Sequence, residues 1–176
     1  MTAFAMAFSL TVILSPARTP VALAYNLEGC TWSSSSIYYT PPSDGYNTAA
    51  SDAVGNWNNA NTHVFLYDSN QGIDIFDQND GPTNYYALTT WQCDNNGHFY
   101  NVSSHWNTYY TDNLPYGGKV ALMVHELGHA MGLAHNDSSS ACPVPIMYSD
   151  YNVFYNQCGE STPQQDDIDG INAIYS

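Results

Sequence analysis

Residues 125–135 read HELGHAMGLAH and hold three of the chain's six histidines, together with one glutamate and two glycines. His125 and His129 are four residues apart, so on a helix they project from one face, about 6 Å apart, and could share one metal ion. Neutral imidazole is a common ligand for Zn²⁺. Glu126 follows the first of these histidines and would lie beside the metal, where a general base for a bound water is needed. This spacing predicts a hydrolytic zinc site.

A third ligand requires the chain to turn after the second histidine. His135 would lie roughly 9 Å farther along an unbroken helix than His129, and on another face. Gly132 stands where a left-handed helix C-cap would let the chain fold back. Three protein ligands leave a fourth position open, which is a property of catalytic zinc sites. HExxH alone occurs by chance, but the glycine and the third histidine argue against that interpretation here. The remaining histidines lack such spacing and are interpreted as ordinary strand or loop residues (His63, His98, His105).

The motif also resembles a family signature. HExxHxxGxxH followed by a methionine turn is typical of metzincin metallopeptidases. Met147, in PVPIMYSD (143–150), stands twelve residues past the third histidine and is the candidate for that turn. Tyr148 directly after it, and the C-terminal QQDDIDGINAIYS (164–176), resemble the matrixin branch.

The resemblance implies a role for each of these residues. The three histidines would bind one catalytic Zn²⁺, and Glu126 would take a proton from the attacking water and pass it to the leaving amine. Met147 would form an apolar floor under the ligands, and Tyr148 with the following residues would contribute to the S1′ wall. Asp166 and Asp167 would brace the methionine turn from below. The implied activity is that of a zinc-dependent endopeptidase acting on proteins or peptides.

Calcium is a second cofactor that the resemblance suggests. Residues 68–80, DSNQGIDIFDQND, offer several oxygen ligands, and matrixins often bind calcium in this region. The segment does not match an EF-hand loop, so Ca²⁺ remains a possible cofactor without a defined ligand set.

Charge limits the partners. The chain has 176 residues, enough for one domain, and a net charge of −14, although only 10% of its residues are charged. Its only basic residues are Arg18 and Lys119. Nucleic acid and anionic lipid are therefore excluded as partners, because nothing can neutralise their phosphates. We expect a monomer that meets protein or peptide substrates.

The N-terminus predicts a secretory signal peptide over residues 1–24. MTAFAMAFSLTVIL is apolar but too short to span a membrane, and Ala22-Leu23-Ala24 fits the small-x-small cleavage rule. The expected mature domain is 25–176, secreted and without a membrane association. No lysine or arginine precedes the apolar run, so a misassigned start or an uncleaved anchor is the alternative.

Four cysteines follow this segment, and they allow three pairings. No CxxC is present, which argues against a cysteine zinc site. We favour Cys142–Cys158, which would close a loop around Met147, together with Cys30–Cys93, which would tie the N-terminal segment to the sheet.

Hydrophobic periodicity predicts an α+β domain with a mixed, mostly parallel sheet of about five strands and three helices. The expected strands are 36–40, 63–69, 72–78, 85–92 and 98–104. The expected helices are 48–60, the metal-binding helix, and a last helix with Thr162 as N-cap and Pro163 as its first residue. By the metzincin resemblance, the strand 85–92 would be the edge that binds a peptide, with Ala87, Leu88 and Thr89 lining the cleft.

Three other functions remain open from the sequence. A secreted zinc-containing binding module would suit the many tyrosines, tryptophans and asparagines, but it has no use for a base at Glu126. A zinc hydrolase of a non-peptide amide would use the same residues. An inactive relative with a blocked cleft would keep the motif and lack proteolytic activity.

Overall fold

The computed structural model describes residues 25–176. The predicted signal peptide, residues 1–24, lies outside the described residues. Within the described part, no helix combines the length and the apolar character needed to cross a bilayer.

Five strands form one mixed sheet in the order β3-β2-β4-β6-β5. Neighbouring strands run parallel, except that β5 pairs antiparallel with β6 across a short hairpin. The strands are β2 (Ser36–Thr40), β3 (Phe65–Asp68), β4 (Ile73–Gln78), β5 (Ala87–Cys93) and β6 (Phe99–Asn107). The predicted mixed, mostly parallel sheet is confirmed, and β5 lies at its edge.

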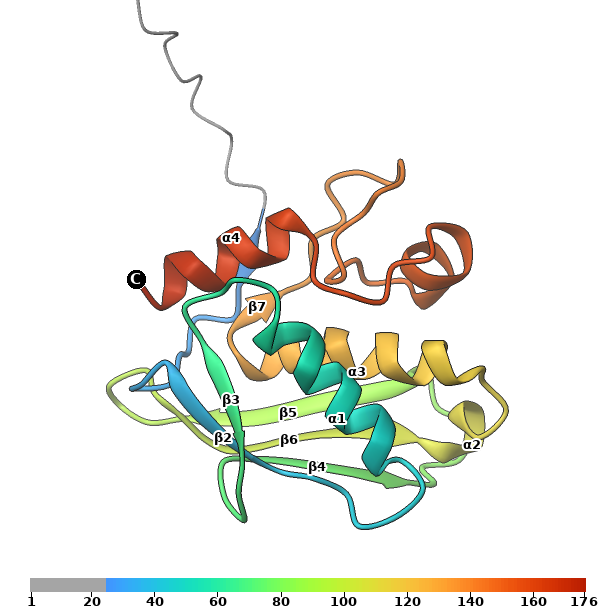
Figure 1. The fold of residues 1–176 in the computed structure, drawn as a ribbon, viewed down its shortest axis with the longest axis horizontal. Helices are drawn as coiled ribbons and strands as arrows, with labels where there is room; N and C mark the ends of the chain where they lie inside the picture. Colours follow the sequence, from blue (N-terminus) through green and yellow to red (C-terminus); the bar gives the residue numbers. More distant parts are fainter. Residues whose placement is uncertain (1–24) are drawn as a thin grey trace, which may run out of the picture.

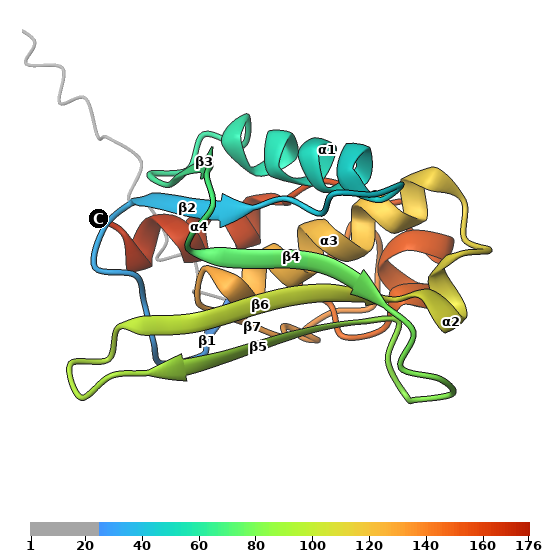
Figure 2. The same ribbon diagram turned by 90° about the horizontal axis from the view of Figure 1, so that it is seen from below.

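Two helices, α1 (Asn47–Asn58) and α3 (Tyr116–Ala130), cover one face of this sheet (Figure 1). Seen from below, strands β4 and β6 lie in front of α3 (Figure 2). The third long helix, α4 (Gln165–Ile174), packs beside β7 (Leu133–Ala134), which pairs antiparallel with β1 (Asn26–Leu27). Two short helices were not predicted, namely α2 (Thr108–Thr111) and the π-helix η1 (Asn152–Gln157).

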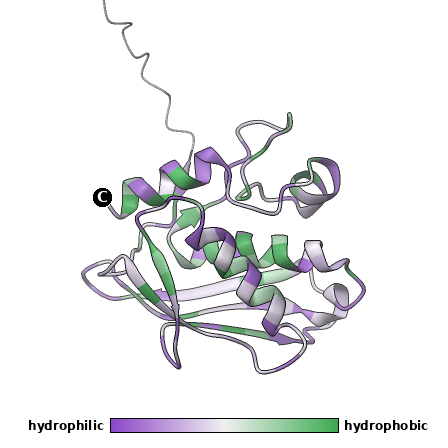
Figure 3. Cartoon of the chain, viewed as in Figure 1, coloured by the Kyte–Doolittle hydropathy of each residue, from purple (hydrophilic) through white to green (hydrophobic). Residues whose placement is uncertain are grey.

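Helix α3 is buried on nearly all sides. Its residues 120–130 are all buried, and its central turns are coloured as hydrophobic residues (Figure 3). Three tryptophan indoles from other parts of the chain donate hydrogen bonds to its backbone carbonyls: Trp57 to Val124 (2.8 Å), Trp106 to Lys119 (2.9 Å) and Trp32 to Ala130 (2.8 Å). These bonds fix the helix against α1, against β6 and against the N-terminal segment. The helix that carries the motif is therefore a rigid platform.

Several predicted boundaries were wrong. The last helix begins at Gln165, with Gln164 as N-cap, and not at Pro163 after Thr162. Asp167 explains the shift, because its carboxylate accepts the backbone N–H of Gln164 at 2.7 Å and closes a capping box. Strand β6 has nine residues and extends to Asn107, beyond the predicted 98–104, because its C-terminal residues 103–107 pair with β4.

Both favoured disulfides are present in the structure. Cys30–Cys93 joins the N-terminal segment to β5, and Cys142–Cys158 closes the loop that carries Met147. No described cysteine is free.

Candidate active site

The three histidines of the motif converge on one point. Their Nε2 atoms lie 3.1 Å (His125 to His135), 3.2 Å (His125 to His129) and 3.1 Å (His129 to His135) apart. Nitrogens that each lie about 2.0–2.1 Å from a tetrahedral zinc are about 3.3 Å apart, so the observed spacing suits one such ion. No other group of three potential metal-binding side chains is found within residues 25–176.

Hydrogen bonds on the far side of two rings set their tautomers. The Nδ1–H of His125 donates to the carbonyl oxygen of Ile146 (2.7 Å), and the Nδ1–H of His129 donates to that of Leu133 (2.8 Å). A carbonyl can only accept, so both Nε2 atoms keep their lone pairs for a metal. Burial lowers the pKa of His125 well below its usual value, which also favours the neutral, metal-binding form. The donor set therefore fits zinc.

The turn that brings in the third histidine is built on glycine. Helix α3 ends at Ala130, and Gly132 has φ +111°, a conformation that other residues rarely adopt. A Cβ at this glycine would also lie 2.9 Å from the carbonyl oxygen of Cys30. The predicted glycine stop is thus confirmed, and β7 then leads to His135.

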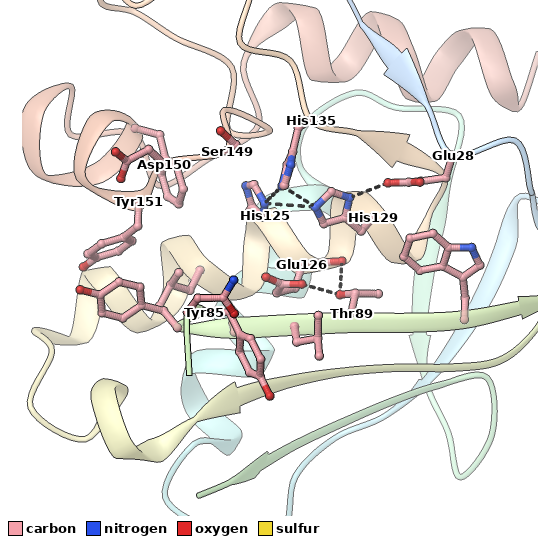
Figure 4. Close-up of a pocket in the computed structure, with 17 residues that line it drawn as sticks. Glu28, Tyr85, Thr89, His125, Glu126, His129, His135, Ser149, Asp150 and Tyr151 are labelled. Carbon is pink, nitrogen blue, oxygen red and sulfur yellow. Dashed lines mark hydrogen bonds and ion pairs between the residues drawn. The ribbon is translucent and has the colours of Figure 1, made fainter. Parts of the chain in front are cut away.

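Glu126 lies on the same helix face, beside the three rings (Figure 4). Its side chain is 5% exposed, and burial raises its pKa above the usual value, although the charge of His129 and a hydrogen bond from Thr89 oppose this. A buried carboxylate with a raised pKa is a stronger base than one in water. The arrangement can accept a proton from a water near the Nε2 atoms.

Met147 packs against α3 at Gly128, next to the second histidine in sequence, and is 2% exposed. Its backbone carbonyl accepts the N–H of Asn136 (2.9 Å), and its own N–H donates to the Asp167 carboxylate (3.2 Å). Gly128 leaves the space that its thioether fills, since a Cβ there would overlap the sulfur. These contacts hold Met147 in the core against α3, between the segment after the third histidine and α4.

A cavity of about 550 Å³ runs past the histidines along β5. Its lining includes Ala87, Leu88 and Thr89 of the edge strand, as expected from the resemblance. On the opposite side the lining consists of Ser149, Asp150, Tyr151 and Phe154. Tyr148 is half-buried, packs against the core and lies outside this lining, so the wall is formed by the residues that follow it.

Two residues near the site could not be found from the motif. Glu28 lies with its carboxylate 3.3 Å from Nδ1 of His129, and its presence raises the pKa of that histidine even though burial alone would lower it. Asn136, the residue after the third histidine, is 3% exposed and donates to Asp166 (2.8 Å), which links the ligand loop to α4. For Asn136, the only signal in the sequence is that a polar residue directly follows the third histidine.

Comparison with known proteins decides the family. A family model described as Matrixin (Peptidase_M10) matches residues 31–176, nearly the whole described domain. The chain belongs to the matrixin family. This agrees with the resemblance found in the motif, and it identifies the chain with a family of zinc metalloproteases.

Two individual proteins are also similar to this matrixin. Human neutrophil collagenase is 51% identical over 51 residues, which make up 29% of this chain and 10% of the collagenase. The match thus spans about a tenth of that relative's length. The solved structure of myroilysin covers 77% of this chain and 63% of its own, with 15% identity and a TM-score of 0.41.

Proposed function

We propose that this matrixin is a secreted zinc-dependent endopeptidase. One observation carries the proposal: the Glu126 carboxylate stands beside three converging histidine Nε2 atoms, at the floor of a cleft that a sheet edge borders. A site built only to hold a metal would have no need for a buried base facing an open side of the ligand set.

The edge strand supports a peptide substrate. β5 pairs with β6 on one side only, so the backbone groups of its other side remain available to an extended chain. Ala87 and Thr89 are buried beside the cavity and Leu88 is half-buried, which leaves a flat strand along the cleft. A peptide that pairs with β5 as a further strand would lie with its backbone beside the three histidines.

The chemistry divides between the metal and the chain. Zinc held by His125, His129 and His135 would supply Lewis-acid activation of the water and of the scissile carbonyl. Glu126 takes the proton of the attacking water and returns it to the leaving amine, as its position beside the ligands allows. Tyr151 and Phe154 of the opposite wall hold the side chain of the residue after the cleaved bond.

Secretion is supported by two independent features. The segment 1–24 has the apolar run and the small residues of a signal peptide. All four cysteines are paired in two disulfides, which persist in oxidising compartments.

Casein or gelatin cleavage by protein expressed from the full chain tests this proposal. The expected result is cleavage that o-phenanthroline abolishes and that Glu126→Ala lowers by at least about 10³-fold, with about one zinc per chain retained in the variant. His129→Ala should lose the zinc, whereas His63→Ala, a change at an exposed histidine outside the group, should keep both zinc and activity.

Other outcomes would redirect the assignment. One bound zinc without cleavage of any protein would favour the binding module or a non-peptide amide as substrate. A folded protein that binds no zinc would contradict the metal site itself.

A further inference from the structure

Thr89 of the edge strand makes a close polar contact with Glu126. Its Oγ1 lies 2.6 Å from Oε2 of Glu126 and 2.9 Å from Oγ of Ser104, the residue opposite it on β6. All three side chains are buried, with 6%, 5% and 0% exposure for Thr89, Glu126 and Ser104 respectively. Figure 4 shows the threonine beside the carboxylate, on the strand that borders the cleft.

Proton counting assigns the directions of these bonds. A carboxylate only accepts, so the single hydroxyl proton of Thr89 goes to Oε2 of Glu126. Ser104 then donates to Thr89, which makes a short relay from β6 through β5 to the helix. The backbone carbonyl of Glu126, 3.0 Å from the same hydroxyl, is a weaker competitor for that proton.

The other carboxylate oxygen is left for the reaction. Among the described residues, no hydrogen bond reaches Oε1 of Glu126, whereas Oε2 is occupied by the threonine. A glutamate side chain has three rotatable bonds, so a base of this kind needs an external contact to hold one oxygen toward a water. Thr89 supplies such a contact from a strand rather than from a loop.

We infer that Thr89 is a positioning residue, whose hydroxyl clamps Oε2 of Glu126 and thereby presents Oε1 to the water that attacks the substrate. The inference rests on the proposed function for the identity of the base. Strand β5 would then have two roles, because the edge that binds the peptide backbone also orients the carboxylate of Glu126. Specificity for a peptide lying on β5 and proton transfer by Glu126 then depend on the same rigid element.

The neighbouring pair on this hairpin offers a matched control. Thr90 faces Ser103 across the same two strands, with their hydroxyl oxygens 3.0 Å apart, but this pair is on the opposite face of the sheet and Thr90 is exposed. Removing either hydroxyl breaks one threonine–serine contact in β5–β6. Only the loss at Thr89 also frees Glu126.

The test compares Thr89→Val, Thr89→Ser and Thr90→Val in protein expressed from the full chain, with zinc content measured in each. Thr89→Val, which keeps the shape but not the hydroxyl, should lower kcat by about 10- to 100-fold while KM and zinc stay within about twofold. Thr89→Ser should restore kcat to within about threefold, and Thr90→Val should match the wild type. Wild-type kcat in folded Thr89→Val, or a serine variant as slow as the valine variant, would overturn the inference.

A crystal structure of the zinc-loaded wild-type protein gives a readout independent of activity. The Thr89 hydroxyl should remain within hydrogen-bonding distance of Glu126, and in Thr89→Val the carboxylate should occupy more than one position. A hydroxyl farther than about 3.5 Å from both carboxylate oxygens would overturn the clamp, even if the valine variant failed to fold. If instead the wild type cleaves nothing while the clamp is present, the proposed function fails and the contact stands.

Discussion

The Nδ1 atom of His125 lies 2.7 Å from the carbonyl oxygen of Ile146, so the first histidine of the motif is hydrogen-bonded directly to the turn that carries Met147. The same turn is bonded from below by Asp167, whose carboxylate accepts the N–H of Ile146 at 2.8 Å and of Met147 at 3.2 Å. A continuous chain of contacts therefore runs from α4 through the turn to the metal site. Residues of α4 that touch no substrate can act on zinc binding through this chain.

Asp167→Asn tests this connection. The amide would place its own N–H against a backbone N–H of the turn, so we expect a loss of about 1–3 kcal/mol in the free energy of unfolding and weaker zinc binding. Urea unfolding and a zinc titration measure the two effects. Asp169→Asn is the matched control, since that exposed residue of the same helix accepts a side-chain hydrogen bond only from Gln165 (2.8 Å) among residues 25–176. Equal behaviour of the two variants would contradict the proposed coupling.

Two facing carboxylates make stability depend on pH. Burial, with a further contribution from Asp44, raises the pKa of Asp77 to about 6, from 3.8. The folded protein thus holds a proton that the unfolded chain releases. Stability from this group is full below about pH 4 and is lost as pH rises to about 6. We expect a decrease on the order of 1–2 kcal/mol over this window, after allowing for partial solvent exposure.

Asp77→Asn removes the titration and places an amide donor beside Asp44. The variant should be more stable than the wild type at pH 7, and the fall in stability between pH 4 and 6 should become smaller. Part of the fall should remain, because burial also raises the pKa of Asp167 to about 6. Chemical denaturation at several pH values measures both. Asp44 has a lowered pKa, so its own contribution is lost only in stronger acid, outside this window. If the free energy of unfolding of Asp77→Asn depends on pH between 4 and 6 as strongly as that of the wild type, the Asp44–Asp77 pair is not a source of this dependence.

Gly128→Ala should damage the metal site from below. The added methyl would overlap the sulfur of Met147, so we expect a loss of about 1–3 kcal/mol in stability together with lower zinc affinity. Combining it with Met147→Ala should recover part of the loss, because the second change removes the overlapping atoms. Gly55→Ala in α1 has open space around it and should instead stabilise by about 0.5–1 kcal/mol. Thermal melts and zinc titrations of Gly128→Ala, Met147→Ala, their combination and Gly55→Ala check this. The expectation is contradicted if the stability losses of Gly128→Ala and Met147→Ala simply add in the combined variant.

The two disulfides should have separable effects. Replacing Cys30 and Cys93 by serine should cost about 4 kcal/mol and replacing Cys142 and Cys158 about 3 kcal/mol, because the closed segments differ in length, with sequence separations of 63 and 16. Activity should fall more in the second pair, whose loop carries Met147. Unfolding curves and cleavage rates at a temperature where both variants are folded measure this. Greater loss of activity in the first pair would argue against the loop's role.

The sequence alone determined the features that depend on nearby residues. An i, i+4 pair of histidines must share a helix face, and a glycine three residues after His129 permits the turn to His135, so the ligand set followed from spacing. β2 was predicted at its observed bounds because an alternating run ends at two prolines, Pro41 and Pro42. Four cysteines allow three disulfide pairings, and this number follows from the sequence without the fold.

Only the tertiary structure decided which distant groups meet. Thr89 and Glu126 are separated by 37 residues, and nothing in either local sequence shows that β5 brings the hydroxyl to the carboxylate. Asp167 moved the start of α4 because its carboxylate is shared between its own helix cap and the methionine turn. Such contacts arise from the packing of α3 between the sheet and the C-terminal segments, and periodicity within one element carries no information about them.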